Sequence, residues 1–444
     1  MPTTPTVLEE WRAHNPKSGS AYTEAARLMI DGVTQDVRFE APYPVTIVGS
    51  SGNRVQTLDG DELICYVMGH GSLLLGHAHP DVVRAVQEQA ARAFHYGGSH
   101  PAETEWAEMI VRLIPSAEKV RFTSSGTEAT MLACRLARAA TGRSHIVKFN
   151  GHFGGWHDAL LKGFMVPFDR RFAGVTDEAF GTTTAIDPVP SDLDRLLSVG
   201  DVAAVIIEPA GGYSGAVPVS REFIEHAREA CTRTGTLLIF DEVVTGFRWA
   251  PGGAQQLLGI YPDVTTLGKI MAGGLPGGAV AGRQEFMEVL NAARGQSKVI
   301  HTGTHNGHPL AAAAGIATLR LLEDGGPQKT AEQACHAVVD GFNNVLRAAG
   351  VPGLCYGASS HFCVIVGVPE LAGVTDATKL DSVTLRRGTP PNVLNPLNCA
   401  MMLNGVHLFH GHGFVSSTHN AASTETTVAA FAASIARLQQ EGVL

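Results

Sequence analysis

A single lysine stands between a strand-like stretch and a glycine-rich exit in DVTTLGKIMAGG, residues 263–274. A lysine that forms a Schiff base with a carbonyl compound needs a lowered pKa, which a desolvated or cation-rich pocket supplies. The glycines after Lys269 would let the backbone pass close to a bound group. The alternative for this stretch taken alone is a solvated loop lysine.

Two other polar stretches also follow apolar strands. Asp241 and Glu242 come directly after LLIF, and a carboxylate there is costly unless a cation meets it. The alternative is an acidic pair held by backbone N–H groups. In RFTSSGTEA, residues 124–127 lead from a strand into a helix and could cradle an anion. The compatible alternative is an ordinary cap, since Glu128 follows Ser125 at capping-box spacing.

Together the three stretches fit the three handles of pyridoxal 5'-phosphate. The phosphate needs N–H and hydroxyl donors, the pyridine nitrogen needs an anion, and the aldehyde needs an amine. The combination is far more specific than any one stretch.

The elements around these stretches alternate between strand and helix. Unbroken apolar strands such as VAAVII and LLIF suit a parallel sheet covered on both faces, which predicts a doubly wound α/β domain. Ligands bind at the carboxyl ends of such strands. We expect helices over 21–30, 127–140, 221–234, 330–349 and 425–440. The expected parts are an N-terminal segment (1–70) that joins the small domain, a large cofactor-binding domain (71–322) and a small α+β domain (323–444).

Composition favours small-molecule chemistry. The 444 residues carry a net charge of −9, which makes nucleic acid or an anionic membrane a poor partner. Seven cysteines without a C-x-x-C pair indicate a reducing cytoplasm. We find no secretory signal and no run of about 18 apolar residues that could span a membrane.

The chain resembles the class III aminotransferases of fold-type I, closest to the glutamate-1-semialdehyde aminomutase-like and β-amino acid transaminase branch. The resemblance covers nearly the whole chain. It implies a mainly parallel seven-stranded sheet and a homodimer. The matching stretches are TLDGDELICYVMGHGSLLLGHAHPDVVRAV, SSGTEA, IFDEVVTGFR, TLGKIMAGGLPGGAVAGR and TGTHNGHPLAAAAGIA.

The resemblance also implies roles for individual residues. The phosphate would be held by Ser125, Gly126 and Thr127. Asp241 would pair with the ring nitrogen, and Val243 would pack on one ring face. Lys269 would carry the Schiff base, and Thr304 would reach the phosphate of the neighbouring subunit. Glu208 would lie near the cofactor, although a structural role at its strand end is equally open.

Departures from the family pattern narrow the interpretation. Phe153 replaces the tyrosine of a Tyr-His-Gly stretch, which keeps ring stacking and loses the hydroxyl. Tyr213 replaces the glutamate that acts as an arginine switch in the glutamate- and ornithine-type relatives. GVTQDVR resembles the aminomutase stretch whose arginine holds a carboxylate, which makes Arg38 the candidate anchor, with a surface arginine as the alternative. GVHLFHGHGF (405–414) lacks the acidic residue of true aminomutases.

The predicted function is a pyridoxal-phosphate aminotransferase that exchanges an amino group between an amino donor and a carbonyl acceptor with ping-pong kinetics. The alternative within this class is an aminomutase, epimerase or racemase. A metal-dependent hydrolase would need His407, His410 and His412 to share an ion, but no carboxylate accompanies them at ligand spacing, so no metal is expected. A nucleotide-binding dehydrogenase is disfavoured because residues 273–282 do not read G-x-G-x-x-G.

Overall fold

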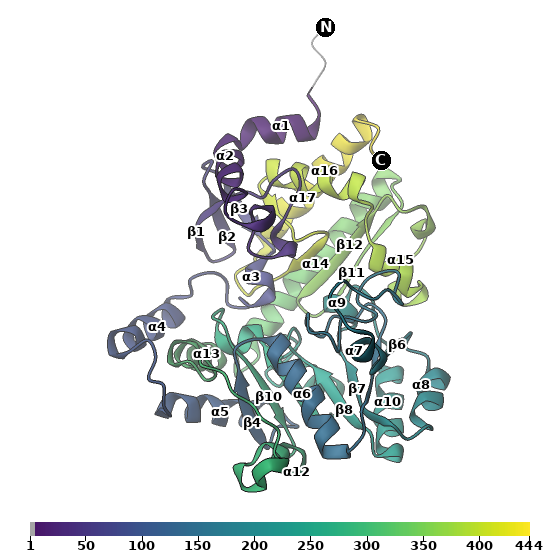
Figure 1. Ribbon diagram of the computed structural model, residues 1–444. Coiled ribbons are helices and arrows are strands. Elements are labelled where there is room, and N and C mark those ends of the chain that lie inside the picture. The colour runs from purple at the N-terminus through teal and green to yellow at the C-terminus, as the bar shows by residue number, and fades with distance from the viewer. Residues whose placement is uncertain (1–4) are drawn as a thin grey trace.

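A seven-stranded sheet forms the centre of the lower half of the molecule in the computed structural model, which describes residues 5–444 (Figure 1). Its order is β4-β10-β9-β8-β7-β5-β6. The strands are β4 (Lys119–Thr123), β10 (Gly278–Gly282), β9 (Val264–Gly268), β8 (Leu237–Asp241), β7 (Val202–Ile207), β5 (His145–Phe149) and β6 (Thr183–Ile186).

The pairing within this sheet confirms the predicted α/β class. Strands β9, β8, β7, β5 and β6 run parallel to one another, while β10 is antiparallel to both β4 and β9. All residues of β7, β8, β9 and β10 are buried, as expected for strands covered on both faces. Helix α6 (Gly126–Thr141) packs on β9 and β10, and α10 (Arg221–Thr234) packs on β8.

The upper half joins the two ends of the chain (Figure 1). A four-stranded sheet, β1-β2-β3-β13, pairs β3 with β13 in parallel, and a three-stranded sheet has the order β11-β12-β14. The strands are β1 (Ile47–Ser51), β2 (Arg54–Thr57), β3 (Glu62–Cys65), β11 (Gly353–Ala358), β12 (His361–Val366), β13 (Val406–His407) and β14 (His412–Phe414).

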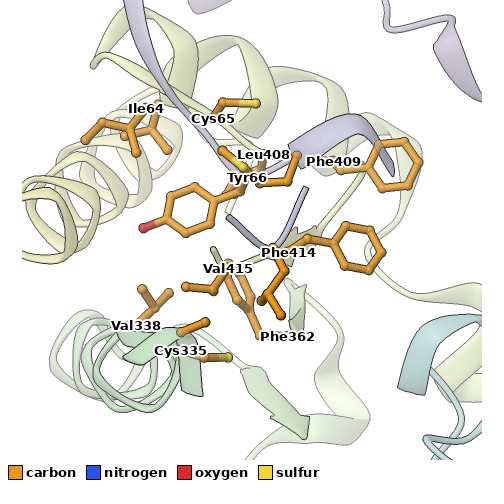
Figure 2. Close-up of a cluster of buried hydrophobic side chains, with 14 of the residues drawn as sticks. Ile64, Cys65, Tyr66, Cys335, Val338, Phe362, Leu408, Phe409, Phe414 and Val415 are labelled. Atoms are coloured by element: carbon orange, nitrogen blue, oxygen red, sulfur yellow. The ribbon is translucent and has the colours of Figure 1, made fainter. Parts of the chain in front are cut away.

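A shared core connects these two small sheets (Figure 2). Tyr66 follows β3, is fully buried, and its hydroxyl lies 3.0 Å from Oγ1 of Thr427. Its ring meets Phe362 of β12 edge-on at 5.6 Å. The N-terminal segment is therefore packed into the same core as the C-terminal part of the chain.

The remaining helices complete the two halves. The α-helices are α1 (Val7–His14), α2 (Pro16–Ala25), α3 (Met68–Gly71), α4 (Pro80–Arg92), α5 (Pro101–Leu113), α7 (Asp177–Gly181), α8 (Pro190–Leu197), α9 (Gly212–Gly215), α11 (Gly253–Leu258), α12 (Gln284–Met287), α13 (Pro309–Leu322), α14 (Gly326–Ala349), α15 (Ser382–Arg387), α16 (Pro391–Leu403) and α17 (Ala421–Gln440). The 3-10 helices are η1 (Ile30–Gly32), η2 (Asp36–Arg38), η3 (Lys269–Ala272), η4 (Glu288–Leu290), η5 (Ala292–Ser297), η6 (Pro369–Leu371) and η7 (Ala377–Lys379). None of the helices between residues 5 and 444 is long and apolar enough to cross a membrane.

Helix boundaries show where the sequence prediction was right and where it was wrong. The helix predicted over 221–234 has these bounds in the structure. The helix predicted over 21–30 is wrong in its bounds, because α2 begins at Pro16 and ends at Ala25. Proline fits the first helical position, where its missing N–H is not needed. Helix α14 likewise has a proline, Pro327, in its first turn, and it begins at Gly326 and not at residue 330.

Candidate active site

The strand-end residues singled out in the sequence meet at one edge of the large sheet. Asp241 ends β8, Glu208 follows β7, Phe153 lies beyond β5, and Lys269 follows β9. Because these four strands run parallel as neighbours, their carboxyl ends lie along one edge, which is the expected place for a ligand.

Lys269 has an unusual backbone conformation and a largely buried side chain. Its φ is +50°, in the left-handed region that lysine rarely adopts. Its side chain is largely buried, and its amine donates no hydrogen bond to any residue from 5 to 444. Burial lowers the pKa of Lys269, while the charges of Asp241 and Glu208 oppose this shift and that of Arg248 adds to it. A buried amine with no protein partner is available to a carbonyl group.

Asp241 has one oxygen in use and one free. Oδ1 accepts hydrogen bonds from the Val243 N–H at 3.2 Å and the Thr266 hydroxyl at 3.0 Å. The second oxygen accepts none within the described residues. Burial raises the pKa of Asp241, opposed by these hydrogen bonds and by Lys269. A cationic ring N–H would satisfy the free oxygen, so the site fits a protonated pyridine.

The neighbouring Glu242 matches the structural alternative. Its carboxylate accepts hydrogen bonds from the backbone N–H groups of Ala254 and Gln255 and from the Thr245 hydroxyl. It is therefore satisfied by the protein itself. Only Asp241 of this acidic pair keeps an oxygen for a ligand.

The start of α6 combines a cap with an anion cradle. The Ser125 hydroxyl accepts the Glu128 N–H at 3.2 Å, and the Glu128 carboxylate accepts the Ser124 N–H at 2.8 Å. The N–H groups of Gly126 and Thr127 have no acceptor within the part of the chain described. These two free donors at a helix start fit a phosphate.

Gly126 also lets Val243 approach the helix start. A Cβ added to Gly126 would lie 2.8 Å from both methyl carbons of Val243. Val243 also lies against Gly268, where an added Cβ would be 3.2 Å from Cγ1. The two glycines thus leave room for the valine between the helix start and the lysine turn.

Glu208 is engaged by the backbone of the loops around it. Its carboxylate accepts the N–H groups of Phe153 at 2.6 Å, Tyr213 at 3.3 Å and Ser214 at 3.3 Å. Burial and the charge of Asp241 raise the pKa of Glu208. The geometry places Glu208 close to the site and gives it a part in holding the loop that carries Phe153.

Lys148 is a buried cation, bonded to the loop of Phe153, that the sequence analysis did not single out. It is fully buried in β5, and its amine donates to the carbonyls of His152 at 2.7 Å, Phe153 at 3.3 Å and Leu160. Burial lowers the pKa of Lys148 to about 7, against the charges of Glu208 and Asp241. The available signal was a lysine inside the apolar stretch HIVKFN, where a charge needs a reason.

Two predicted site residues, Thr304 and Arg38, are exposed in the structure. Thr304 is exposed, and its carbonyl lies 2.6 Å from Nε2 of His95. Arg38 is exposed in η2 and donates to the Thr34 hydroxyl at 2.9 Å. Burial lowers the pKa of His70 to about 4, and the charges of Lys269 and Arg38 add to this shift.

The three clustered histidines take three different partners. His407 lies 3.1 Å from both oxygens of Glu40, His410 3.0 Å from a backbone carbonyl, and His412 3.0 Å from the sulfur of Cys363. No group of three or more potential metal ligands exists in residues 5–444.

The family model described as Aminotransferase class-III matches residues 37–353. The glutamate-1-semialdehyde 2,1-aminomutase of Methanopyrus kandleri is 36% identical over 441 residues, covering 95% of this chain and 98% of that protein. A solved transaminase with PLP bound has a TM-score of 0.87 and 32% identity, over 96% of this chain and 99% of its own. The omega-transaminase of Sphaerobacter thermophilus has a TM-score of 0.86 and 29% identity, over 95% and 98%.

Proposed function

The chain belongs to the class III aminotransferase family, and we propose that it moves an amino group between an amino acid or amine and a keto acid or aldehyde. It is an enzyme of this family that uses pyridoxal 5'-phosphate. The observation that carries the assignment is the pairing of a buried, unpartnered amine at Lys269 with a half-free carboxylate at Asp241.

Different residues of the chain would hold different parts of the cofactor. When bound, pyridoxal phosphate supplies an aldehyde that condenses with amines and a ring that withdraws electrons. Ser125, Gly126 and Thr127 would hold its phosphate, Asp241 its ring nitrogen, and Phe153 and Val243 its two faces. Lys269 would hold the aldehyde covalently between turnovers.

Lys269 also moves the proton. Burial lowers the pKa of the free amine, which favours its neutral form, and neutral Nζ would take a proton from the amine-bearing carbon of the substrate and later return one. The donor and the acceptor occupy the one site in turn, which gives ping-pong kinetics.

The assembly and the location follow from other features. Thr304 is exposed in the single chain, which supports a homodimer in which it reaches the cofactor of the neighbouring subunit. All seven cysteines are free, which supports a cytoplasmic location. The division at residues 70 and 322 into large and small domains is part of the same proposal.

Replacing Lys269 by alanine tests the assignment. We expect turnover and the visible absorbance of a lysine-bound cofactor both to disappear, while Lys298→Ala, at an exposed lysine, keeps both. A Lys269→Ala protein that retained both properties would remove the proposed function.

An aminomutase is the second candidate, because the relative from Methanopyrus kandleri carries that name at 36% identity. Against it stands the lack of an acidic residue in 405–414. An aminomutase converts one amino compound without consuming a separate acceptor. Measuring product with and without 2-oxoglutarate or pyruvate therefore separates the two candidates.

A further inference from the structure

We propose that Arg386, together with His412 and Tyr213, forms a subsite for a carboxylate of the substrate, distant from the reacting amine. The inference rests on the proposed function and names a residue of α15 that selects the substrate class. Neither the motifs nor the predicted anchor at Arg38 account for this arginine.

Arg386 is a half-buried guanidinium without an acidic partner. Its Cζ lies 4.6 Å from the centre of the Phe164 ring and 4.5 Å from that of Tyr213. Its Nε donates to the Phe164 carbonyl at 2.9 Å. No carboxylate of residues 5–444 lies within ion-pair distance of it, and its two terminal nitrogens donate to no residue in that range.

The alternative role for Arg386 is a staple between α15 and the loop of Phe164. A staple uses one of the five N–H donors of a guanidinium, and here one is used. The four donors that remain form the planar fork that matches a carboxylate. A half-buried cation with unused donors is suited to an anion that comes with the ligand.

His412 adds a second polar group that, like the guanidinium, packs against the ring of Tyr213. Its Nδ1 lies 3.0 Å from the sulfur of Cys363, and burial raises the pKa of that thiol far above its usual range. A protonated thiol can donate to Nδ1, and the neutral ring then carries its proton on Nε2. Nε2 donates to no residue of the described chain.

Tyr213 connects Arg386 and His412 to the residues of the candidate active site. The ring of His412 meets its ring edge-on at 5.4 Å, and the Tyr213 hydroxyl has no hydrogen-bond partner in residues 5–444. The Tyr213 N–H donates to Glu208, and Phe164 lies 4.8 Å from Phe153. The free donors are thus one aromatic ring away from the proposed cofactor-stacking residue. Figure 1 shows α15 descending from the upper half toward α9.

The test is the binding of glutarate, a dicarboxylate without an amine or a carbonyl, to the holoprotein by isothermal titration calorimetry. We expect Arg386→Gln to weaken binding by about tenfold or more, the loss typical of a charge-assisted hydrogen bond. Arg386→Lys should bind with intermediate strength, because it keeps the charge and loses the fork. Arg387→Gln removes the adjacent exposed arginine and should bind as the parent does.

Four results would overturn the subsite. The first is that glutarate does not bind to the parent, and the second is that it binds equally to the parent and to Arg386→Gln. The third is that binding is lost only in Arg38→Ala. The fourth is that both variants at position 386 unfold while Arg387→Gln folds. The last result would establish the staple. The titration measures binding and does not depend on turnover. Its result therefore tests the subsite even if the Lys269→Ala experiment contradicts the proposed function.

Discussion

Replacing Gly126 by alanine should push the phosphate cradle against Val243. The added Cβ would lie 2.8 Å from Cγ1 and Cγ2 of the valine, and 3.4 Å from its Cβ. Carbon atoms rest about 3.5–4.0 Å apart, so the valine or the helix start must move by roughly 0.7–1.2 Å. Such overpacking costs about 1–3 kcal/mol. If the strain falls on the cofactor-bound state, the dissociation constant of the cofactor rises about 5- to 150-fold.

The matching substitution on the other side of the contact should restore the fit. Val243→Ala removes both methyl carbons that the new Cβ would meet. The double variant should therefore be more stable than the sum of the two single changes by about 1 kcal/mol or more. Gly181→Ala is the control, because its added Cβ meets nothing within 4 Å. Thermal unfolding and cofactor titration by fluorescence quenching measure both effects.

A Gly126→Ala variant that matched the parent in stability and in cofactor affinity would contradict this prediction. So would a double variant in which the losses of the two single variants simply add. Either result would mean that Val243 does not press on the start of α6, and its proposed place against the cofactor ring would fall with that contact.

Three further predictions concern the rest of the site and the fold. Asp241→Asn should lower turnover by about 100-fold or more, as the loss of one preorganised electrostatic partner does in other enzymes. A steady-state assay with saturating cofactor measures this, and unchanged turnover would contradict the role of Asp241. Arg38→Ala should raise KM for carboxylated donors far more than for simple amines, and equal losses for both would remove Arg38 as an anchor. Burial disfavours the charged forms of Glu40 and His407, but their mutual attraction outweighs this effect. The net result is a lowered pKa for Glu40 and a raised pKa for His407. Its stabilising effect is therefore greatest between the ordinary values of 4.5 and 6.5, fading as pH rises through the raised pKa of His407 and as it falls through that of Glu40. His407→Gln should thus cost about 3–5 kcal/mol of unfolding free energy near pH 5.5 and much less at pH 9 in urea titrations, and a loss independent of pH would contradict the pairing.

The sequence was sufficient where local chemistry decides position. Lys269, Asp241 and residues 125–127 could be found because each follows an apolar strand of a predicted parallel sheet, and such strands end at one edge. Helix 221–234 could be bounded because Ser220 caps its start and Gly235 ends it in the left-handed conformation. In each case the signal and the structure are only a few residues apart.

It was insufficient where contacts join distant segments. Arg386 lies more than 170 residues from Tyr213 in the chain, and its setting depends on how α15 meets the loop of Phe164. The antiparallel course of β10 is likewise invisible in GGAVAGR, since its apolar pattern is the same in either direction. Thr304 has its proposed contact in a second subunit, so no single chain can contain it.

The buried charges at the sheet edge explain why Lys148 belongs with the site. The charge of Asp241 raises the pKa of Glu208, because two neighbouring anions are unfavourable in a dry environment. Lys269 offsets one of them, but its amine is the group that must leave to react. Lys148 is tied to three carbonyls and stays in place. We therefore expect Lys148, in its protonated form, to offset part of this negative charge from a fixed position, and the ring nitrogen of a bound cofactor would meet the free oxygen of Asp241.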